Sequence, residues 1–508
     1  MIASSPKKKP ITSMKIKYLL SVIAIVAITK DSFAQYSQDV VRFSTFQNGS
    51  TSRIKAIGNA GTAIGGDLSS ISGNPAGLGF FTHSEFSITP EFNGSKVKSS
   101  YFGQAGNDSK NSVNLSNASI VYYQRLNTAK GRDKTKGWLS INYGAGYSRT
   151  NNFYENIVYG GKNASNSISD YYAGTANNHP DDQLAQWAYS DKLIDNFGTT
   201  QRPDFASTVS VPVNQTGVIS RVGGQSEFDF AFGANYSNKL YLGLGVAITD
   251  LRYDYSRQFI EDGTASITNG GTVGTPTPFN SIYAQNQSTR GSGANVKLGV
   301  IYKPVEAVRL GFTFTSPTFY SVNDVYAEGL ATSINGRPNQ PNSSGDYALN
   351  YNMRTPLKLA GGASVFIGKY GFISGDVEYI DYSTTHISSN DSYDNAGDID
   401  AIKANYKSAI NLHVGAEARV TNMFYLRGGY SQQGSPFKNN TGATDVSSDI
   451  KTVSGGIGLR FGQYYVDATY AHVTGSESFS PYLINNGNPT ANFKKTNDNA
   501  FLTLGYRF

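Results

Sequence analysis

Side chains alternate with a period of two along most of this chain, from Ser84 onward. In residues 240–248 every even position is Leu, Val or Ile, and the odd positions are mostly small. In residues 412–420 aliphatic or Ala positions alternate with small or charged residues such as Gly415 and Glu417. Alternate residues of a β-strand point to opposite faces. This repetition is typical of strands about 10 residues long that face lipid on one side and a polar lumen on the other.

Fourteen such segments can be counted along the chain. We estimate them at 84–98, 112–126, 136–150, 226–237, 239–256, 288–303, 306–320, 354–367, 369–384, 405–420, 423–433, 449–462, 463–477 and 497–508. Short connections alternate with long ones, and the long ones are expected at 99–111, 151–225, 257–287, 321–353, 385–404, 434–448 and 478–496. Outer-membrane barrels have short periplasmic turns and long external loops, and an even strand number places both ends of the chain in the periplasm.

The first 34 residues have the organisation of a secretory signal peptide. A basic start at residues 14–17 is followed by an apolar run over residues 18–28, and Ser32 and Ala34 are small residues at the two positions that a signal peptidase reads. The run is too short to span a bilayer, which needs about 20 apolar residues. We therefore expect cleavage after Ala34 and a mature chain that begins at Gln35.

Removal of this segment changes the charge of the chain. The whole sequence has a formal net charge of +6, but the segment holds six Lys and one Asp, which leaves 37 basic and 36 acidic residues and a net charge of +1. The charge therefore does not indicate nucleic-acid binding. No apolar stretch after residue 35 reaches the length of a transmembrane helix, and a membrane protein without such helices can only be a closed barrel. We expect it in the cell outer membrane.

The end of the sequence and the size of the barrel agree with this interpretation. Leu502, Leu504, Tyr506 and Phe508 alternate with polar or small residues, and such a last strand resembles the signal that the outer-membrane barrel assembly machinery reads. Fourteen strands enclose more volume than their own side chains fill. Residues 35–83 are available as a plug. The predicted fold is all-β: a 14-stranded antiparallel transmembrane β-barrel over residues 84–508, with a hatch of short helices over residues 35–83 inside the lumen.

The plug segment carries a motif. Small residues 58–63 are followed by Asp67 and then by Asn74-Pro75-Ala76. This resembles the hatch of the FadL/TodX family of outer-membrane transporters for hydrophobic compounds, in a Bacteroidetes-type member. The resemblance implies passive uptake of long-chain fatty acids or aromatic hydrocarbons by a monomer that contacts outer-membrane lipid. Ligands of the family meet an external hydrophobic groove, pass to a pocket in the barrel, and leave sideways through a gap in the wall after the hatch shifts.

Two further features bear on that route. Within the long loop 151–225, which we expect to be partly helical, Leu184, Trp187, Ile194 and Phe197 stand at helical spacing after an expected helix start at His179-Pro180-Asp181-Asp182. These four residues are a candidate hydrophobic ligand groove, or they seat the loop on the barrel rim. Pro90 interrupts the first strand and removes one ladder hydrogen bond. It marks a candidate gap in the wall, or a simple β-bulge.

The remaining polar residues indicate structural ion pairs and do not indicate a catalytic or metal-binding site. Six acids and six bases on the inferred inward face predict pairing across the lumen and to the hatch: Glu227, Asp229, Asp376, Glu378, Glu417 and Asp467 against Lys297, Arg309, Arg419, Arg427, Arg460 and Arg507. The five His show no metal-ligand spacing, and the acidic stretch 394–400 lacks the EF-hand pattern and is expected to be a solvated external loop. We expect no cofactor, no metal and no enzymatic activity.

Three other functions share parts of this pattern. A barrel of the same architecture can serve as a component or cargo shuttle of a protein secretion system, as in type IX secretion, and stable co-purification with exported proteins would favour that role. An outer-membrane lipase needs a nucleophile constellation that the sequence does not show. An open porin is disfavoured by the plug-like N-terminal segment.

Overall fold

The computed structural model describes residues 33–45, 49–127, 133–269, 272–389, 393–438, 445–485 and 487–508. The predicted signal peptide lies outside these residues, apart from its last two positions, whose backbone begins a helix. Across the described ranges, no helix is both long and apolar enough to cross a membrane.

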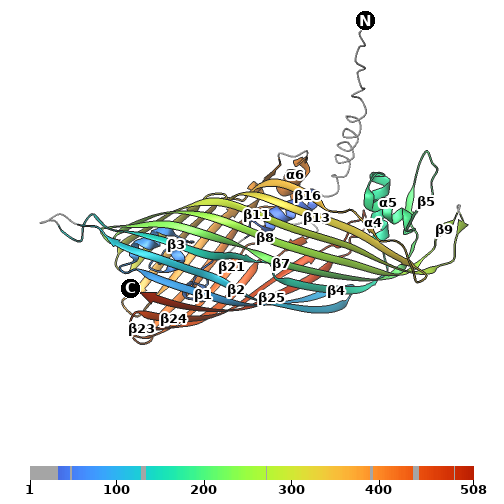
Figure 1. Cartoon of the computed structure of the whole chain (residues 1–508). Helices are drawn as coiled ribbons and strands as arrows, with labels where there is room; N and C mark the ends of the chain where they lie inside the picture. The colour runs from blue at the N-terminus through green and yellow to red at the C-terminus, as the bar shows by residue number, and fades with distance from the viewer. Residues whose placement is uncertain are drawn as a thin grey trace, which may run out of the picture.

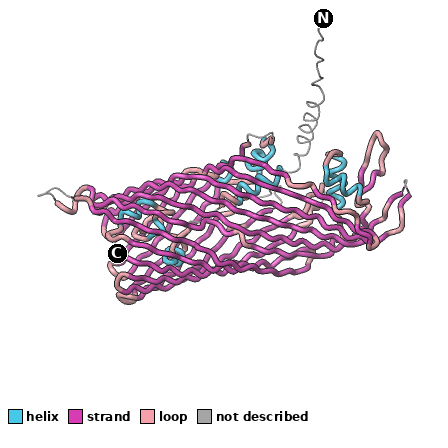
Figure 2. The backbone as a smooth tube through the Cα atoms, viewed as in Figure 1, coloured by secondary structure: helices cyan, strands magenta, loops and turns pink. Residues whose placement is uncertain are grey.

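The described chain begins with short helices and continues as strands. The helices before the barrel are α2 (Phe33–Arg42), α3 (Ser52–Ala56), η1 (Leu68–Ser70) and η2 (Pro75–Phe80). Those between strands are α4 (Ile168–Asn178), α5 (Gln183–Ser190), η3 (Tyr382–Thr384) and α6 (Ala396–Asn405). Figure 2 shows short helices inside the barrel near the end where the C-terminus lies, and others at its outer half.

The barrel wall is one antiparallel sheet. Its strands are β1 (Glu85–Tyr101), β2 (Gln104–Arg125), β3 (Trp138–Asn152), β4 (Glu155–Asn163), β7 (Val209–Tyr236), β8 (Leu240–Ala265), β11 (Thr277–Val305), β12 (Val308–Thr315), β13 (Phe319–Ile334), β16 (Tyr347–Arg354), β17 (Lys358–Ile367), β18 (Gly371–Asp381), β19 (His386–Ser388), β20 (Ser408–Arg419), β21 (Phe424–Gln433), β23 (Ile450–Phe461), β24 (Tyr464–Phe479) and β25 (Ala491–Arg507). Short rim pieces are β5 (Ile194–Asn196), β6 (Phe205–Ser207), β9 (Thr268–Asn269), β10 (Thr272–Val273), β14 (Arg337–Pro338), β15 (Asn342–Ser343) and β22 (Asp445–Ser447).

Four wall strands are interrupted and consist of two pieces each. β3 and β4 both pair with β7, and β12 and β13 both pair with β11. In the next wall strand, β16 pairs with β13 and β17 pairs with β12. In the one after it, β19 pairs with β16 and β18 pairs with β17. Counted in this way the described wall has fourteen strands, and it closes because β1 pairs with both β2 and β25 (Figure 1). The predicted strand number and closure are confirmed.

The strands extend further at the outer end than the sequence pattern predicts. The expected loop 99–111 is strand on both sides of a turn at Phe102-Gly103, and β8 and β11 run through most of 257–287. Outside the lipid a wall strand no longer needs an apolar outer face, so the hydrophobic alternation ends while the hydrogen-bond ladder continues. The predicted outer boundaries were therefore wrong, for a physical reason.

The two faces of the wall are those that the alternation predicts. Phe228, Phe230 and Phe232 are 50%, 54% and 49% exposed on the outer face, whereas Asp229 between them is 2% exposed. The inner space is filled by side chains in two large clusters at the outer half of the barrel. One joins α4 and α5 to the rim, and the other joins α2 to α6 and to the wall. The hatch segments α3, η1 and η2 occupy the opposite half.

Candidate functional site

The hatch motif is bound to the wall through Asn74. Its side-chain oxygen accepts a hydrogen bond from the Ala76 amide at 3.1 Å, which caps η2, and its amide group donates to Thr62 O at 2.7 Å. The same amide group lies 3.4 Å from the carbonyl oxygens of Val300 on β11 and Phe312 on β12. Asn74 therefore shapes the turn and also attaches it to two wall strands.

Asp67 organises the interior of the hatch. Its carboxylate caps η1 by accepting from the Ser69 amide at 3.0 Å, and it accepts from the Thr51 hydroxyl at 2.9 Å. A guanidinium nitrogen of Arg53 lies 3.7 Å away. Asp67 thus connects the chain before α3 with η1.

Glycines on the inner face of the wall allow the hatch backbone to touch the strands directly. A Cβ atom added to Gly243 on β8 would lie 2.1 Å from the Ala76 nitrogen, and one on Gly299 would lie 2.0 Å from the Asn74 side-chain oxygen. Equivalent positions on other strands are Gly311 against Thr62 O at 2.3 Å and Gly415 against Ile57 O at 2.2 Å. Any side chain at these positions would displace the hatch. The sequence pattern showed small residues on this face but not their role.

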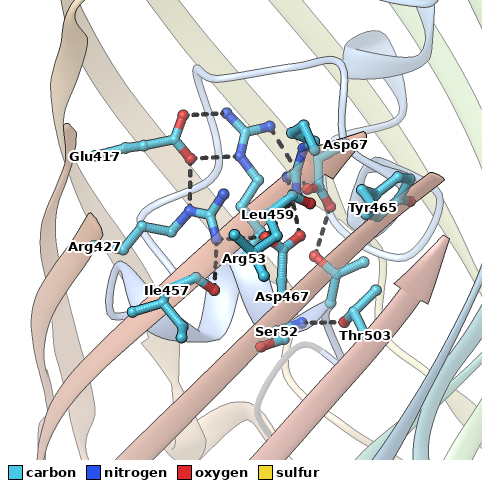
Figure 3. A network of polar contacts seen from close by, with 12 residues as sticks. Ser52, Arg53, Asp67, Glu417, Arg427, Ile457, Leu459, Tyr465, Asp467 and Thr503 are labelled. Carbon is cyan, nitrogen blue, oxygen red and sulfur yellow. Dashed lines mark hydrogen bonds and ion pairs between the residues drawn. The ribbon is translucent and has the colours of Figure 1, made fainter. Parts of the chain in front are cut away.

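An ionic network fixes α3 to the barrel (Figure 3). Arg53 of α3 donates two hydrogen bonds to Glu417 of β20, at 2.8 and 3.1 Å. Glu417 also accepts from Arg427 of β21 at 2.7 Å, and Arg427 donates to Asp467 of β24 at 2.6 Å. Arg460 of β23 contributes two more hydrogen bonds to Asp467. The predicted pairing of inward charges is confirmed here.

Other inward charges follow the prediction in part. Lys297 forms ion pairs with both Glu227 and Asp229 at 2.7 Å. Asp376 accepts a hydrogen bond from the Thr62 amide at 2.8 Å and so binds the hatch. Glu378 pairs with Lys358 at 3.5 Å, a base that the sequence analysis did not include.

The wall is locally irregular beside α3, at Pro90. In the pairing of β1 with β2 the register shifts between Thr89 and Pro90, which is the predicted bulge. On its other side β1 pairs with β25, and this pairing is interrupted. Ile88 pairs with Leu504 and Glu91 pairs with Phe501, but Thr89 and Pro90 between them have no partner in the ladder. The Thr89 hydroxyl instead lies 2.7 Å from the Thr503 hydroxyl, and Thr503 accepts the Ser52 amide of α3 at 2.8 Å. The hatch helix thus lies directly behind an interrupted part of the β1–β25 seam.

A groove of about 860 Å³ opens on the outer face at this seam. Its lining is mainly apolar and comes from β1, β2, β21 and β23–β25: Pro90, Phe92, Val113, Leu426, Ile457, Tyr470 and Leu502. Its inner side reaches residues of the lumen face, among them Glu91, Arg427 and Phe501. Lys55 of α3 lies above the Phe501 ring, with its ammonium nitrogen 5.4 Å from the ring centre. The groove therefore lies on the lipid side of a part of the wall whose lumen side is in contact with α3.

The candidate ligand groove of the outer loop is differently arranged than expected. The helix that was expected from His179 is α5, which begins after its N-cap Asp182 and ends at Ser190. Ile194 and Phe197 follow this helix, so the predicted helical spacing was wrong for them. Leu184 and Ile194 are buried in the rim cluster, Trp187 packs against it partly buried, and Phe197 is 51% exposed. Leu184 and Ile194 therefore pack the loop against the rim of the barrel.

The acidic stretch 394–400 also differs from the expectation of a solvated loop. It forms the first half of α6, where Asp398 is completely buried against α2. The described residues contain no group of His, Asp and Glu arranged to hold a metal ion.

The closed wall of fourteen strands, the N-terminal hatch in its lumen and the anchoring of Asn74 define a hatch-plugged β-barrel with the FadL fold. The likeness is seen in solved structures. A FadL homologue from Pseudomonas aeruginosa superimposes with a TM-score of 0.53 and 13% sequence identity, covering 91% of this chain and 99% of that chain. The toluene transporter TodX from P. putida gives a TM-score of 0.51 at 13% identity, with the same coverage.

These likenesses confirm the predicted FadL/TodX resemblance for the fold. No protein-family model matches the sequence, and no curated protein matches it either.

Proposed function

We propose that this protein lies in the outer membrane and lets hydrophobic small molecules pass inward without an energy source of its own. The observation that carries the proposal is the position of the hatch helix α3 behind the interrupted β1–β25 seam, where an apolar groove opens on the lipid-facing side. The fold is that of a FadL homologue and a toluene transporter, which supports the proposal.

The seam offers a way out of the barrel that avoids water. A proline on β1 removes one ladder donor, and two residues of β1 have no ladder partner in β25. Fewer hydrogen bonds must therefore break to widen the wall here than at a regular pair of strands. A hydrocarbon that leaves through the seam enters the groove lined by Phe92, Ile457 and Leu502 and stays in contact with apolar surface.

Helix α3 of the hatch controls the way from the lumen to the seam. The Ser52 hydroxyl donates to the Thr469 hydroxyl at 2.7 Å, and the Ser52 amide donates to Thr503. Together with the Arg53–Glu417 ion pair, these contacts hold α3 against the inner side of the seam. A small shift of α3 away from β24 and β25 would connect the lumen with the groove.

A disulfide lock tests this directly, because the chain contains no native Cys. In the double variant Ser52→Cys/Thr469→Cys the bond would fix α3 to β24, and we expect uptake of a fluorescent fatty acid or a labelled monoaromatic hydrocarbon to fall to background. Reduction with a thiol reagent should restore it. The matched control is Ser364→Cys/Ser374→Cys, whose hydroxyls also lie 2.7 Å apart but join two wall strands. Equal uptake by the locked and the control variants would contradict the proposal.

A further inference from the structure

Helix α2 fills the outer half of the lumen and is surrounded by buried carboxylates. Asp39 of α2, Asp324 of β13 and Asp398 of α6 are 2%, 0% and 0% exposed. Among the described residues, Asp39 has an ion pair with Arg42, whereas Asp324 and Asp398 have none with Lys or Arg. Buried carboxylates are costly unless a cation compensates them. Within the described residues, Asp324 and Asp398 are thus buried carboxylates without an ion pair.

Asp398 of α6 accepts a hydrogen bond from the first half of α2. Its Oδ1 accepts the Ser37 amide at 2.9 Å, and its Oδ2 accepts the Tyr393 hydroxyl. In a helix that begins at Phe33, the Ser37 amide has an acceptor within the helix, the carbonyl of residue 33. In a helix that begins at Gln35 it has none, because the first four amides of a helix lack internal partners. The bond to Asp398 thus suits a helix that starts where the predicted signal peptide ends.

Cleavage also supplies the missing cation. Hydrolysis of the Ala34–Gln35 bond adds one water molecule: the new Ala34 carboxylate leaves with the peptide, and the freed Gln35 nitrogen takes up protons to become an ammonium. That nitrogen belongs to the same helical turn as the Ser37 amide.

We propose that removal of the signal peptide places the α-ammonium group of Gln35 against the Asp398 carboxylate, and that this ion pair fixes α2 in the outer half of the lumen. The inference rests on the predicted cleavage site and is independent of the transport function. Processing of the N-terminus therefore completes the outer plug of the barrel.

The electrostatics of Asp398 agree with a missing partner. In the uncleaved chain, burial raises the pKa of Asp398 to about 7, the hydrogen bond from the Ser37 amide opposes this rise, and the nearby Asp39 carboxylate adds to it. In the part of the chain that the structure describes, the groups that face Asp398 are the Tyr393 hydroxyl, the Ser37 amide and Asp39, and none of these three is a cation.

The test is the chemical reactivity of the N-terminal amine in the folded, purified protein. Mass spectrometry of the N-terminal peptide first identifies the residue that carries the amine, for which we expect Gln35. A reagent that acylates free α-amines should then label the wild type roughly tenfold more slowly than Asp398→Asn, which corresponds to about 1.4 kcal/mol of protection. Asp398→Asn keeps an oxygen that accepts the Ser37 amide. The matched control is Asp400→Asn, an exposed position on the same helix, which should behave like the wild type.

A second measurement uses the wild type alone and so does not depend on a variant that folds. The pH dependence of labelling should give an apparent pKa of the amine above the usual value of about 8. An amine on a different residue, an N-terminal glutamine that has cyclised and carries no ammonium, or equal labelling of wild type and Asp398→Asn would each overturn the inference.

Discussion

Gly243 on the inner face of β8 approaches the hatch so closely that a Cβ atom there would lie 2.1 Å from the amide nitrogen of Ala76. Two carbon or nitrogen atoms in van der Waals contact are about 3.5–4.0 Å apart, so this position admits no side chain without movement. The contact lies beside the Asn74-Pro75-Ala76 turn, on which the attachment of the hatch depends. A single methyl group added at Gly243 would therefore displace the hatch.

We expect Gly243→Ala to loosen the hatch and to destabilise the protein by about 1–3 kcal/mol, the range for overpacked sites. Gly245→Ala is the matched control on the same strand and the same face, because its Cβ would meet no atom closer than 3.6 Å. Ion conductance of single barrels in planar bilayers and thermal unfolding measure the two effects. A conductance of Gly243→Ala equal to that of Gly245→Ala would show that the hatch tolerates the displacement.

The ion pair between Arg53 and Glu417 predicts a second effect. Removal of one partner of a buried pair leaves the other uncompensated and typically costs about 3–5 kcal/mol. We expect Glu417→Gln to lower stability by that order and to raise the rate of proteolytic cleavage in the hatch. Asp250→Asn is the control, since its pair with Arg252 is exposed and such pairs contribute about 0–1 kcal/mol. Similar losses in both variants would contradict the role of the network.

Pro90 provides a prediction for the seam. Substitution of Pro90 by Ala restores an amide donor to β1 and should let the ladder with β25 close, so hydrophobic uptake should decrease while stability stays equal or rises. Pro278→Ala, at the outer end of β11, changes a proline far from the seam and should leave uptake unchanged. Uptake that is unaffected by Pro90→Ala would place the exit elsewhere.

Substitutions of two rim residues distinguish a role in packing the loop from a role in binding ligand. Truncation of buried Leu184 to Ala should cost about 2–5 kcal/mol, as for other core leucines. Phe197→Ser should change stability by less than about 0.5 kcal/mol, because the ring is exposed. Loss of hydrophobic ligand binding in Phe197→Ser, measured with a fluorescent fatty acid, would support a capture surface at the rim, and unchanged binding would leave only the seating role.

The pH dependence of α2 distinguishes the uncleaved from the mature chain. A carboxyl group whose pKa is raised in the folded state binds more protons there than when unfolded, so its contribution to stability falls as the pH rises toward that pKa. In a chain that keeps its signal peptide, α2 should become more susceptible to protease between about pH 5 and pH 7, the range below the raised pKa of Asp398. In the mature chain the Gln35 ammonium should keep α2 resistant to protease until the pH is high enough to deprotonate the amine. Identical pH profiles for the two chains would contradict the pairing.

Much of the fold follows from the sequence because lipid imposes a strict pattern. Residues such as Phe228, Phe230 and Phe232 must face outward, and the alternation with Asp229 reveals both the strand and its faces. The hatch motif could be located because Asn74 and Pro75 shape a specific turn. Beyond residue 256, where the predicted strand ends, β8 continues to pair with β11 as far as Ala265.

The contacts between hatch and wall could not be predicted in the same way. An inward glycine such as Gly415 is identical in sequence to one that merely bends a strand, and only the fold places Ile57 against it. The burial of Asp398 was likewise hidden, because the acidic stretch around it has the composition of a solvated loop. Both depend on segments far apart in the sequence, whose approach is decided by the closed barrel.

The proposed transport function is tested by the uptake of labelled long-chain fatty acids and monoaromatic hydrocarbons by cells that lack their own channel for them and express this protein. We predict uptake of at least one of these classes above the level of cells without the protein, saturating with concentration and persisting when the membrane potential is abolished. Uptake no faster than in cells without the protein, together with an exported protein that remains bound during purification, would contradict it and favour a role in secretion.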